Sequence, residues 1–104
     1  GRRCLLIDDM IATGGTITKA ADILLDNGAT EVIVAATHGE FSNPAIDRLK
    51  ASRISEVVVT DTLPLTHVQL FDRLTVLSIA PLLGRAVREI FEDGSVTSLF
   101  DGNA

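Results

Sequence analysis

The sequence predicts an α/β domain built on a parallel sheet of about four strands with flanking helices, and two observations support this prediction. Short apolar runs, several of them rich in β-branched residues, alternate along the chain with amphipathic stretches at helical spacing. That alternation is typical of a parallel sheet whose strands are joined by helices. Apolar residues make up 46% of the 104 residues, enough for the compact core of a single domain.

Each predicted element follows from its local pattern. Strands are expected where apolar residues run without interruption, and helices where apolar positions recur every three to four residues. The 13-residue link over 61–73 contains Pro64 and leaves room for one helical turn at most. The expected order is a strand over 4–8, a helix over 16–27, a strand over 31–37, a short helix from Ser42-Asn43-Pro44 to Ala51, strands over 56–60 and 74–79, and a helix from Ala80-Pro81 to Gly94.

The helix boundaries carry recognisable signals. Asn27-Gly28 is a typical helix stop, and a proline such as Pro44 is tolerated in a first turn, where its missing N–H has no partner to lose. The last helix has an apolar stripe that we expect to face inward, formed by Leu83, Ala86, Val87, Ile90 and Phe91.

The most informative segment joins the first strand to the first helix. Gly14 and Gly15 lack the Cβ atoms that would keep a ligand away, and they allow backbone angles that aim successive N–H groups into one concavity. Thr13 and Thr16 add hydroxyl donors at its rim. The helix that follows brings its positive dipole end to the same place. Together these features predict a site for a phosphate monoester.

Two carboxylates, Asp8 and Asp9, stand immediately before this loop. They would repel a phosphate, so we expect them to accept hydrogen bonds from vicinal hydroxyls or to hold Mg²⁺ bridged to those hydroxyls. A sugar phosphate satisfies both halves of the site. The competing interpretation is an acidic strand end followed by an ordinary glycine turn. A Walker loop is excluded because Thr16-Ile17, not Lys-Ser/Thr, follows the last glycine, and the G-x-G-x-x-G dinucleotide pattern is absent.

The segment from Leu5 to Thr16 resembles the phosphoribosyl-binding loop of type I phosphoribosyltransferases and of ribose-phosphate pyrophosphokinases, also called PRPP synthetases. Further segments resemble the C-terminal domain of PRPP synthetases in the same order: Ala35-Ala36-Thr37-His38-Gly39, Val59-Thr60-Asp61-Thr62-Leu63-Pro64, Leu77-Ser78-Ile79-Ala80-Pro81-Leu82-Leu83 and Gly94-Ser95-Val96-Thr97-Ser98-Leu99-Phe100. The resemblance covers essentially the whole chain. It implies a three-layer α/β fold of the type I phosphoribosyltransferase-like class, with residues 1–104 as the C-terminal, ribose 5-phosphate-binding domain.

That family transfers diphosphate from ATP to ribose 5-phosphate with Mg²⁺ and makes PRPP for nucleotide biosynthesis. The resemblance implies ribose 5-phosphate contacts from the residues of the loop motif: Asp8, Asp9, Ala12, Thr13, Gly14, Gly15 and Thr16. It places no catalytic residue in this chain, since the ATP contacts, a Mg²⁺-binding His and the catalytic Lys and Arg belong to an N-terminal portion that is absent here. No metal ligand is assigned. The family also implies a cytoplasmic homo-oligomer, a hexamer built from dimers.

The end of the chain suggests a second, weaker site. The segment of the family that matches Ser95 and Thr97 borders a regulatory phosphate or ADP site between subunits, so both residues become candidate phosphate ligands. The alternative interpretation is a short edge strand with exposed hydroxyls.

One position departs from the family pattern. The family's loop usually carries a third Asp where this chain has Ala12. This change leaves the backbone N–H groups of the loop in place, but it removes a carboxylate expected beside the ribose. The rival hypothesis is therefore a non-catalytic binding module, either PRPP synthetase-associated or PRPP-sensing. A phosphoribosyltransferase is the enzymatic alternative, although such enzymes share mainly the first loop.

Composition excludes several other functions. The net charge is −5 and the nine Lys and Arg residues are scattered, which argues against nucleic acid and anionic membranes as partners. Cys4 is the only cysteine, so no internal disulfide forms and a reducing cytosol is expected. His38 either reaches the pocket floor or hydrogen-bonds a neighbouring loop. The start at Gly1, with only three residues before the first strand, suggests a piece of a longer polypeptide.

Overall fold

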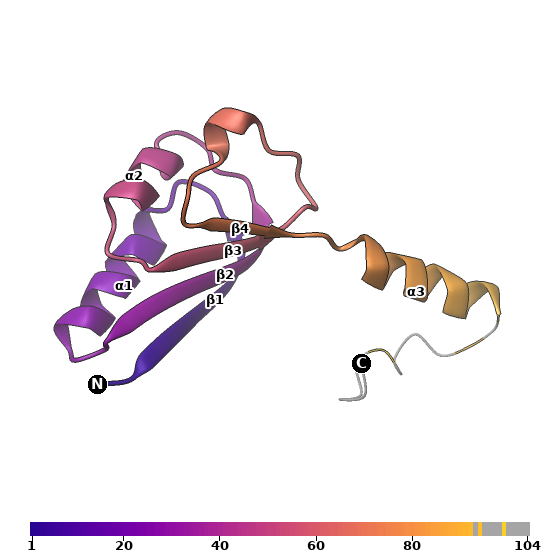
Figure 1. The fold of residues 1–104 in the computed structure, drawn as a ribbon, viewed down its shortest axis with the longest axis horizontal. Coiled ribbons are helices and arrows are strands. Elements are labelled where there is room, and N and C mark those ends of the chain that lie inside the picture. Colours follow the sequence, from indigo (N-terminus) through magenta and orange to yellow (C-terminus); the bar gives the residue numbers. More distant parts are fainter. Residues whose placement is uncertain (93, 95–98, 100–104) are drawn as a thin grey trace.

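The computed structural model describes residues 1–92, 94 and 99. Figure 1 shows strands and helices in alternation, as the sequence predicts. The elements are β1 (Arg3–Ile11), α1 (Gly15–Asp26), β2 (Glu31–Gly39), α2 (Ala45–Ala51), β3 (Glu56–Thr60), a 3₁₀ turn η1 (His67–Gln69), β4 (Leu74–Leu77) and α3 (Ala80–Phe91).

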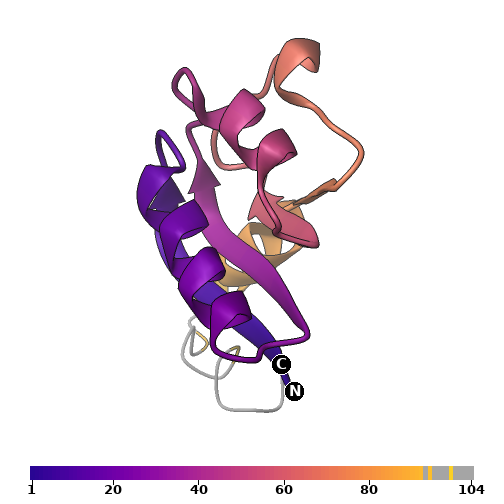
Figure 2. The same cartoon turned by 90° about the vertical axis from the view of Figure 1, so that its left-hand side faces the viewer.

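The four strands form one parallel sheet in the order β1-β2-β3-β4. Helices α1 and α2 lie on the same face of this sheet (Figure 2), whereas α3 extends away from the sheet beyond the end of β4 (Figure 1). The predicted α/β class and the four-stranded parallel sheet are therefore confirmed. No helix among the described residues is long and apolar enough to cross a membrane.

The core lies between the sheet and the two helices α1 and α2. Alternate residues of β2 and β3 point into it, because successive side chains of a strand face opposite sides of a sheet. The described residues that are buried are all apolar: Ile11, Ile17, Ala21, Val32, Val34, Ala36, Phe41, Ala45, Leu49, Ile54, Val57 and Val59.

Several boundaries differ from those expected. β1 continues three residues beyond the predicted end, since Met10 and Ile11 pair with the prolonged end of β2 at His38 and Gly39. The acidic pair Asp8-Asp9 consequently lies inside the strand and not after it. Strand pairing, which depends on a distant segment, extended the element past the end of its apolar run.

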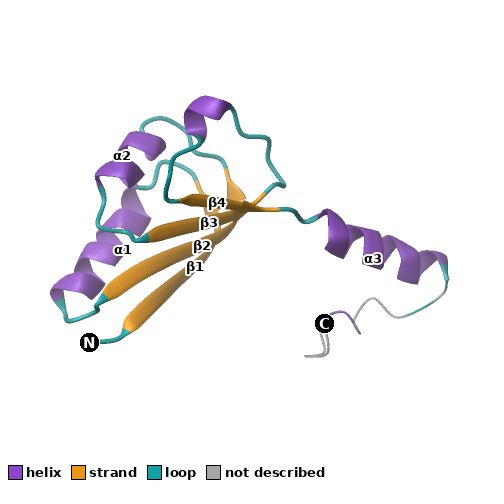
Figure 3. Cartoon of the chain, viewed as in Figure 1, coloured by secondary structure: helices purple, strands orange, loops and turns teal. Residues whose placement is uncertain are grey.

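The opposite face of the sheet is uncovered by any helix among the described residues (Figure 3). Its apolar side chains are accordingly exposed, Leu5 at 58%, Ile7 at 77% and Leu77 at 54%. A shallow apolar hollow of about 240 Å³ lies on this face, bounded in part by Ile7, Ala35 and Leu77. The expected third layer is therefore not present in this part of the chain.

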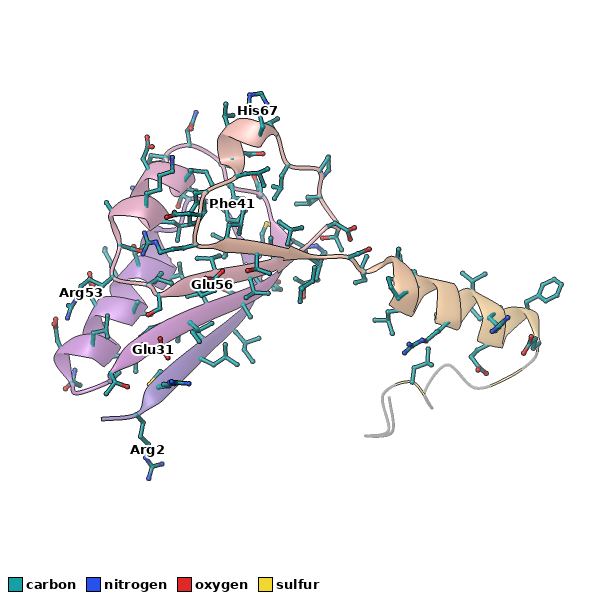
Figure 4. The ribbon with its side chains drawn as sticks, viewed as in Figure 1. Arg2, Glu31, Phe41, Arg53, Glu56 and His67 are labelled. Atoms are coloured by element: carbon teal, nitrogen blue, oxygen red, sulfur yellow. The ribbon has the colours of Figure 1, made fainter. Side chains whose placement is uncertain are left out.

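Polar cross-strand pairs border the uncovered face. Arg3 Nε lies 2.8 Å from Glu31 Oε1, joining β1 to β2. The Thr75 hydroxyl donates to Glu56 Oε1 at 2.8 Å, joining β4 to β3. Figure 4 places Glu31 and Glu56 on neighbouring strands. These pairs join neighbouring strands at the border of the face and leave its centre apolar.

The expectation for α3 was wrong in one respect. The helix forms where predicted, but its apolar stripe faces solvent, with Leu83 at 55%, Val87 at 65% and Ile90 at 67% exposure. The Ile79 N–H donates to Asp61 Oδ1 at 2.9 Å, which joins the start of α3 to the residue after β3, and from there the helix runs away from the sheet (Figure 1). Helical periodicity identifies an apolar face but not the surface that covers it.

One arginine holds the end of α2 against the sheet. The half-buried guanidinium of Arg73, just before β4, donates to backbone carbonyls at and after the end of α2. Nη2 lies 2.9 Å from the Leu49 oxygen, while Nη1 donates to the oxygens of Ser52, at 3.3 Å, and Ile54. A cation is favourable there because the last carbonyls of a helix carry partial negative charge.

A surface ion pair joins α1 to the segment after α2. Arg53 Nη1 lies 2.8 Å from Asp26 Oδ1 and 3.7 Å from Asp22 Oδ1, and Arg53 is exposed (Figure 4). The hydrogen bond to Asp26 raises the pKa of Arg53 above its ordinary value. Because all three groups are in water, the pair contributes little to stability.

We expect Arg73→Met to lower the free energy of unfolding by about 2–3 kcal/mol, because hydrogen bonds from a charged donor are lost and half-buried carbonyls stay unpaired. Arg73→Lys should cost less, since an ammonium still reaches some of the carbonyls. Urea unfolding measures both. Arg85→Met, at an exposed position of α3, is the control and should leave stability unchanged. Equal effects at the two positions would contradict this role for Arg73.

We also expect the isolated chain to self-associate through its uncovered apolar surface. Its charge of −5 opposes association, but at about 0.15 M salt the screening length is near 8 Å, too short to keep apolar patches apart. Ile7→Lys should shift sedimentation toward the monomer and reduce binding of an apolar dye. Ile23→Lys, at an exposed position of α1 on the covered side, should change neither. A monomeric wild-type chain would contradict the prediction.

Candidate functional site

The loop between β1 and α1 forms a hollow at the carboxyl end of β1. Ligands bind at this end of the strands in open parallel sheets. The hollow has a volume of about 200 Å³. The residues around it are Asp8, Met10, Ile11, Ala12, Thr13, Gly14, Gly15, Thr16 and Ile17.

All residues of the predicted loop motif except Asp9 line this hollow. Asp8 lies at its edge and also borders the apolar hollow on the uncovered face. The backbone N–H of Asp9 donates to Asp8 Oδ1 at 2.8 Å, so the Asp8 carboxylate is bound by the following peptide. The structure therefore places one carboxylate beside the glycine loop and the other next to it along the strand.

Gly14 is the residue at which the chain turns into α1. Its φ is +78°, in the left-handed region that favours glycine, and it is buried at the N-cap of the helix. No side chain caps this helix end and no acidic residue stands in its first turn. Among the described residues, no side chain therefore offsets the partial positive charge at the start of α1.

Gly15 has a different reason to be glycine. Of the two loop glycines, only Gly14 has a positive φ, which corrects the expectation that both supply unusual backbone angles. A Cβ atom at Gly15 would lie 2.8 Å from Nη1 of Arg48. A side chain at position 15 would therefore displace the exposed guanidinium of Arg48, which comes from another helix.

Helix α2 packs against the loop between β1 and α1. A Cβ atom at Gly14 would contact Ala45 and Leu49, which are 0% and 1% exposed. Arg48, on the same helix, donates from Nη1 to the Thr13 oxygen at 3.2 Å. The sequence analysis did not identify Arg48, because 35 residues separate it from Thr13 and no local pattern connects them.

The segment after β2 fixes the end of β1. The N–H groups of Glu40 and Phe41 both donate to the Ile11 oxygen at 3.1 Å. Phe41 is 3% exposed with φ +51°, and its ring lies where a side chain at Gly39 would be. Figure 4 shows Phe41 between α2 and the connection that carries η1. This turn fixes where β1 stops and the loop begins, and sequence reasoning did not identify it.

His38 hydrogen-bonds a neighbouring loop, the second of its two interpretations. Its Nδ1 lies 2.7 Å from Oγ1 of Thr62. The hydroxyls of Thr60 and Thr62 donate to the Thr37 oxygen at 2.7 and 3.2 Å. His38 does not line the loop hollow. The network joins the carboxyl ends of β2 and β3 next to the site.

The described residues contain no group of three or more His, Cys, Asp and Glu side chains able to enclose a metal ion. Among the residues that line the loop hollow, Asp8 is the one that carries a carboxylate. Mg²⁺ commonly uses one or two carboxylates together with water and substrate oxygens, so this donor set fits an ion shared with a ligand. Ser95 and Thr97, the candidates for a regulatory phosphate site, lie outside the described residues.

Fold and loop together define an open parallel α/β domain of the class that binds ligands at the carboxyl ends of its strands. More specifically, the chain belongs to the phosphoribosyl synthetase-associated domain family, whose model matches residues 1–101.

Named relatives agree with this family. A ribose-phosphate pyrophosphokinase of Streptomyces coelicolor is 64% identical over 97% of this chain and 31% of its own length. One from Mycobacterium tuberculosis is 58% identical over 100% of this chain and 32% of its own length. The crystal structure of phosphoribosylpyrophosphate synthetase from Mycobacterium smegmatis matches with a TM-score of 0.86 at 54% identity, over 90% of this chain and 32% of that one. The chain spans about a third of the relatives it matches.

Proposed function

We propose that this chain is the ribose 5-phosphate-holding part of a ribose-phosphate diphosphokinase, which transfers diphosphate from ATP to ribose 5-phosphate and makes PRPP for nucleotide biosynthesis. The observation that carries the proposal is the hollow in which Asp8 lies beside the left-handed Gly14 and the uncapped start of α1. The similarity to named ribose-phosphate pyrophosphokinases supports the same reaction.

The two halves of the hollow suit the two ends of the sugar phosphate. Backbone N–H groups at the start of a helix bind a phosphate dianion without a charged side chain, because the helix dipole adds to their partial positive charge. Thr13 and Thr16 add hydroxyl donors. The Asp8 carboxylate accepts hydrogen bonds from ribose hydroxyls, which are donors that a phosphate lacks. In this proposal the phosphate occupies the glycine side and the ribose the acidic side.

Mg²⁺ and ATP complete the proposed reaction. Asp8, the acid that lines the hollow, would hold Mg²⁺ jointly with the sugar hydroxyls, and the ion would supply positive charge to neutralise the diphosphoryl group. The ATP contacts and the catalytic groups would come from the rest of the parent protein, since no residue of this chain is assigned to them.

The remaining expectations follow from the family resemblance and belong to the same proposal. We place residues 1–104 at the C-terminal side of the parent, as the ribose 5-phosphate domain of a type I phosphoribosyltransferase-like fold. The parent would be a cytoplasmic homo-oligomer, a hexamer in the full-length family. Ser95 and Thr97 would contribute to a regulatory phosphate site between its subunits.

Ala12 supports a second candidate function, a non-catalytic PRPP synthetase-associated or PRPP-sensing module. Ala12 lines the hollow where the family usually carries a carboxylate, so the loop would keep the ligand while losing a group beside the ribose. A phosphoribosyltransferase is less well supported, because the named relatives are pyrophosphokinases. Activity of the full-length parent with ATP and ribose 5-phosphate separates the enzyme from the module.

We expect the 104-residue chain to bind ribose 5-phosphate and not ribose, as measured by titration calorimetry, because the phosphate supplies the main contact. Gly14→Ala should weaken binding at least about tenfold by straining the left-handed turn at the loop. Gly28→Ala is the matched control, since Gly28 also has a positive φ of +104° and nothing lies within 4 Å of its added Cβ. Equal binding of ribose, or equal losses in both variants, would contradict the proposed site.

We expect Ala12→Asp in the full-length parent to raise kcat/KM for ribose 5-phosphate roughly tenfold or more, because a hydrogen bond from a substrate hydroxyl to a carboxylate contributes about 1.5–3 kcal/mol. Ala12→Asn has a similar shape without the charge and should gain less. Steady-state kinetics measure both variants. An unchanged or lower value would mean that position 12 acts through its backbone, and an inactive parent would favour the non-catalytic module.

A further inference from the structure

We propose that Arg48 is a positioning residue of the phosphate loop, which sets the direction of the Thr13–Gly14 peptide and so aims the Gly14 N–H at the ligand. This inference rests on the proposed function, since it names what holds that site in its binding shape. Arg48 acts through the loop, because it donates to the Thr13 oxygen at 3.2 Å and is not among the residues that line the hollow.

The backbone of Arg48 belongs to a helix whose inner residues are buried, although its guanidinium is exposed. Its neighbours on α2, Ala45 and Leu49, are 0% and 1% exposed, so the helix cannot shift without disturbing the core. The end of the same helix is held by Arg73 through the Leu49 oxygen. Arg48 therefore links the loop to a helix that is packed in the core.

The peptide geometry explains what this contact decides. In a trans peptide the C=O and the following N–H point in opposite directions. When the Thr13 oxygen turns toward Arg48, the Gly14 N–H turns away from it. A peptide next to glycine flips easily, because glycine accepts φ values of either sign. Glycine at position 14 therefore does not by itself fix which way the Thr13–Gly14 peptide points. The hydrogen bond from Arg48 to the Thr13 oxygen selects one of the two orientations.

Gly15 gives the second line of evidence. The nearest atom to a Cβ built at Gly15 is Arg48 Nη1, at 2.8 Å. Glycine at position 15 thus makes room for this guanidinium, while glycine at 14 makes the turn. Thr13 and Gly15 therefore both lie close to Arg48 and both line the hollow.

The test compares Arg48→Gln, Arg48→Lys and the control Lys50→Gln, which removes one charge from an exposed position of the same helix. In the unliganded 104-residue chain, we expect Arg48→Gln to shift the amide signals of Gly14 and Gly15 and to speed their hydrogen exchange. Arg48→Lys should restore part of the wild-type pattern, since an ammonium also donates to a carbonyl. Lys50→Gln should leave these amides unchanged.

The kinetic arm uses the full-length parent. Arg48→Gln should raise KM for ribose 5-phosphate about tenfold with a smaller change in kcat and an unchanged melting temperature, while Lys50→Gln changes none of them. Unaltered loop amides in Arg48→Gln, or the same KM increase in Lys50→Gln, would overturn the positioning role. Absence of ribose 5-phosphate binding and activity in the wild-type parent would instead overturn the proposed function, and the amide comparison would still decide whether Arg48 orients the loop.

Discussion

The packing of α2 against the sheet is the constraint on which the site depends. Ala45 and Leu49 are buried in the core, and this burial fixes the surface on which Gly14 turns. The same helix sends Arg48 to the Thr13 oxygen, while Arg73 holds its far end. A seven-residue helix has little stability by itself. Packing in the core therefore determines where α2 lies, and α2 in turn determines where the loop lies through its contacts with Thr13 and Gly14.

The core lies on the face of the sheet that α1 and α2 cover, whereas no helix among the described residues covers the other face. Strands of a parallel sheet normally have both faces covered. Here the described residues cover one face, and the outward α3 presents an apolar stripe of its own. The chain spans about a third of the relatives it matches, so apolar surface of this kind is what a part of a longer protein would be expected to carry.

The family match and the loop geometry give two kinds of information about the chain. The match over residues 1–101 places the chain among phosphoribosyl synthetase-associated domains. The geometry adds what a family match does not contain, namely which atoms give the loop its shape. Gly14 supplies a left-handed turn, Gly15 makes room for a guanidinium, and Asp8 lies at the edge of the same hollow. A substitution at Gly14 would therefore strain the backbone, whereas one at Gly15 would displace the guanidinium of Arg48.

The sequence by itself determined the fold class, the order of the elements and the loop that lines the hollow, because strand and helix periodicity and the glycine turn are local properties of the chain. It could not determine that β1 runs through Asp8 and Asp9 to Ile11, since pairing with β2 decides this. Nor could it determine that α3 turns outward, or that Arg48 contacts Thr13, 35 residues away. Those features depend on contacts between distant segments, which exist only after the helices have packed on the sheet.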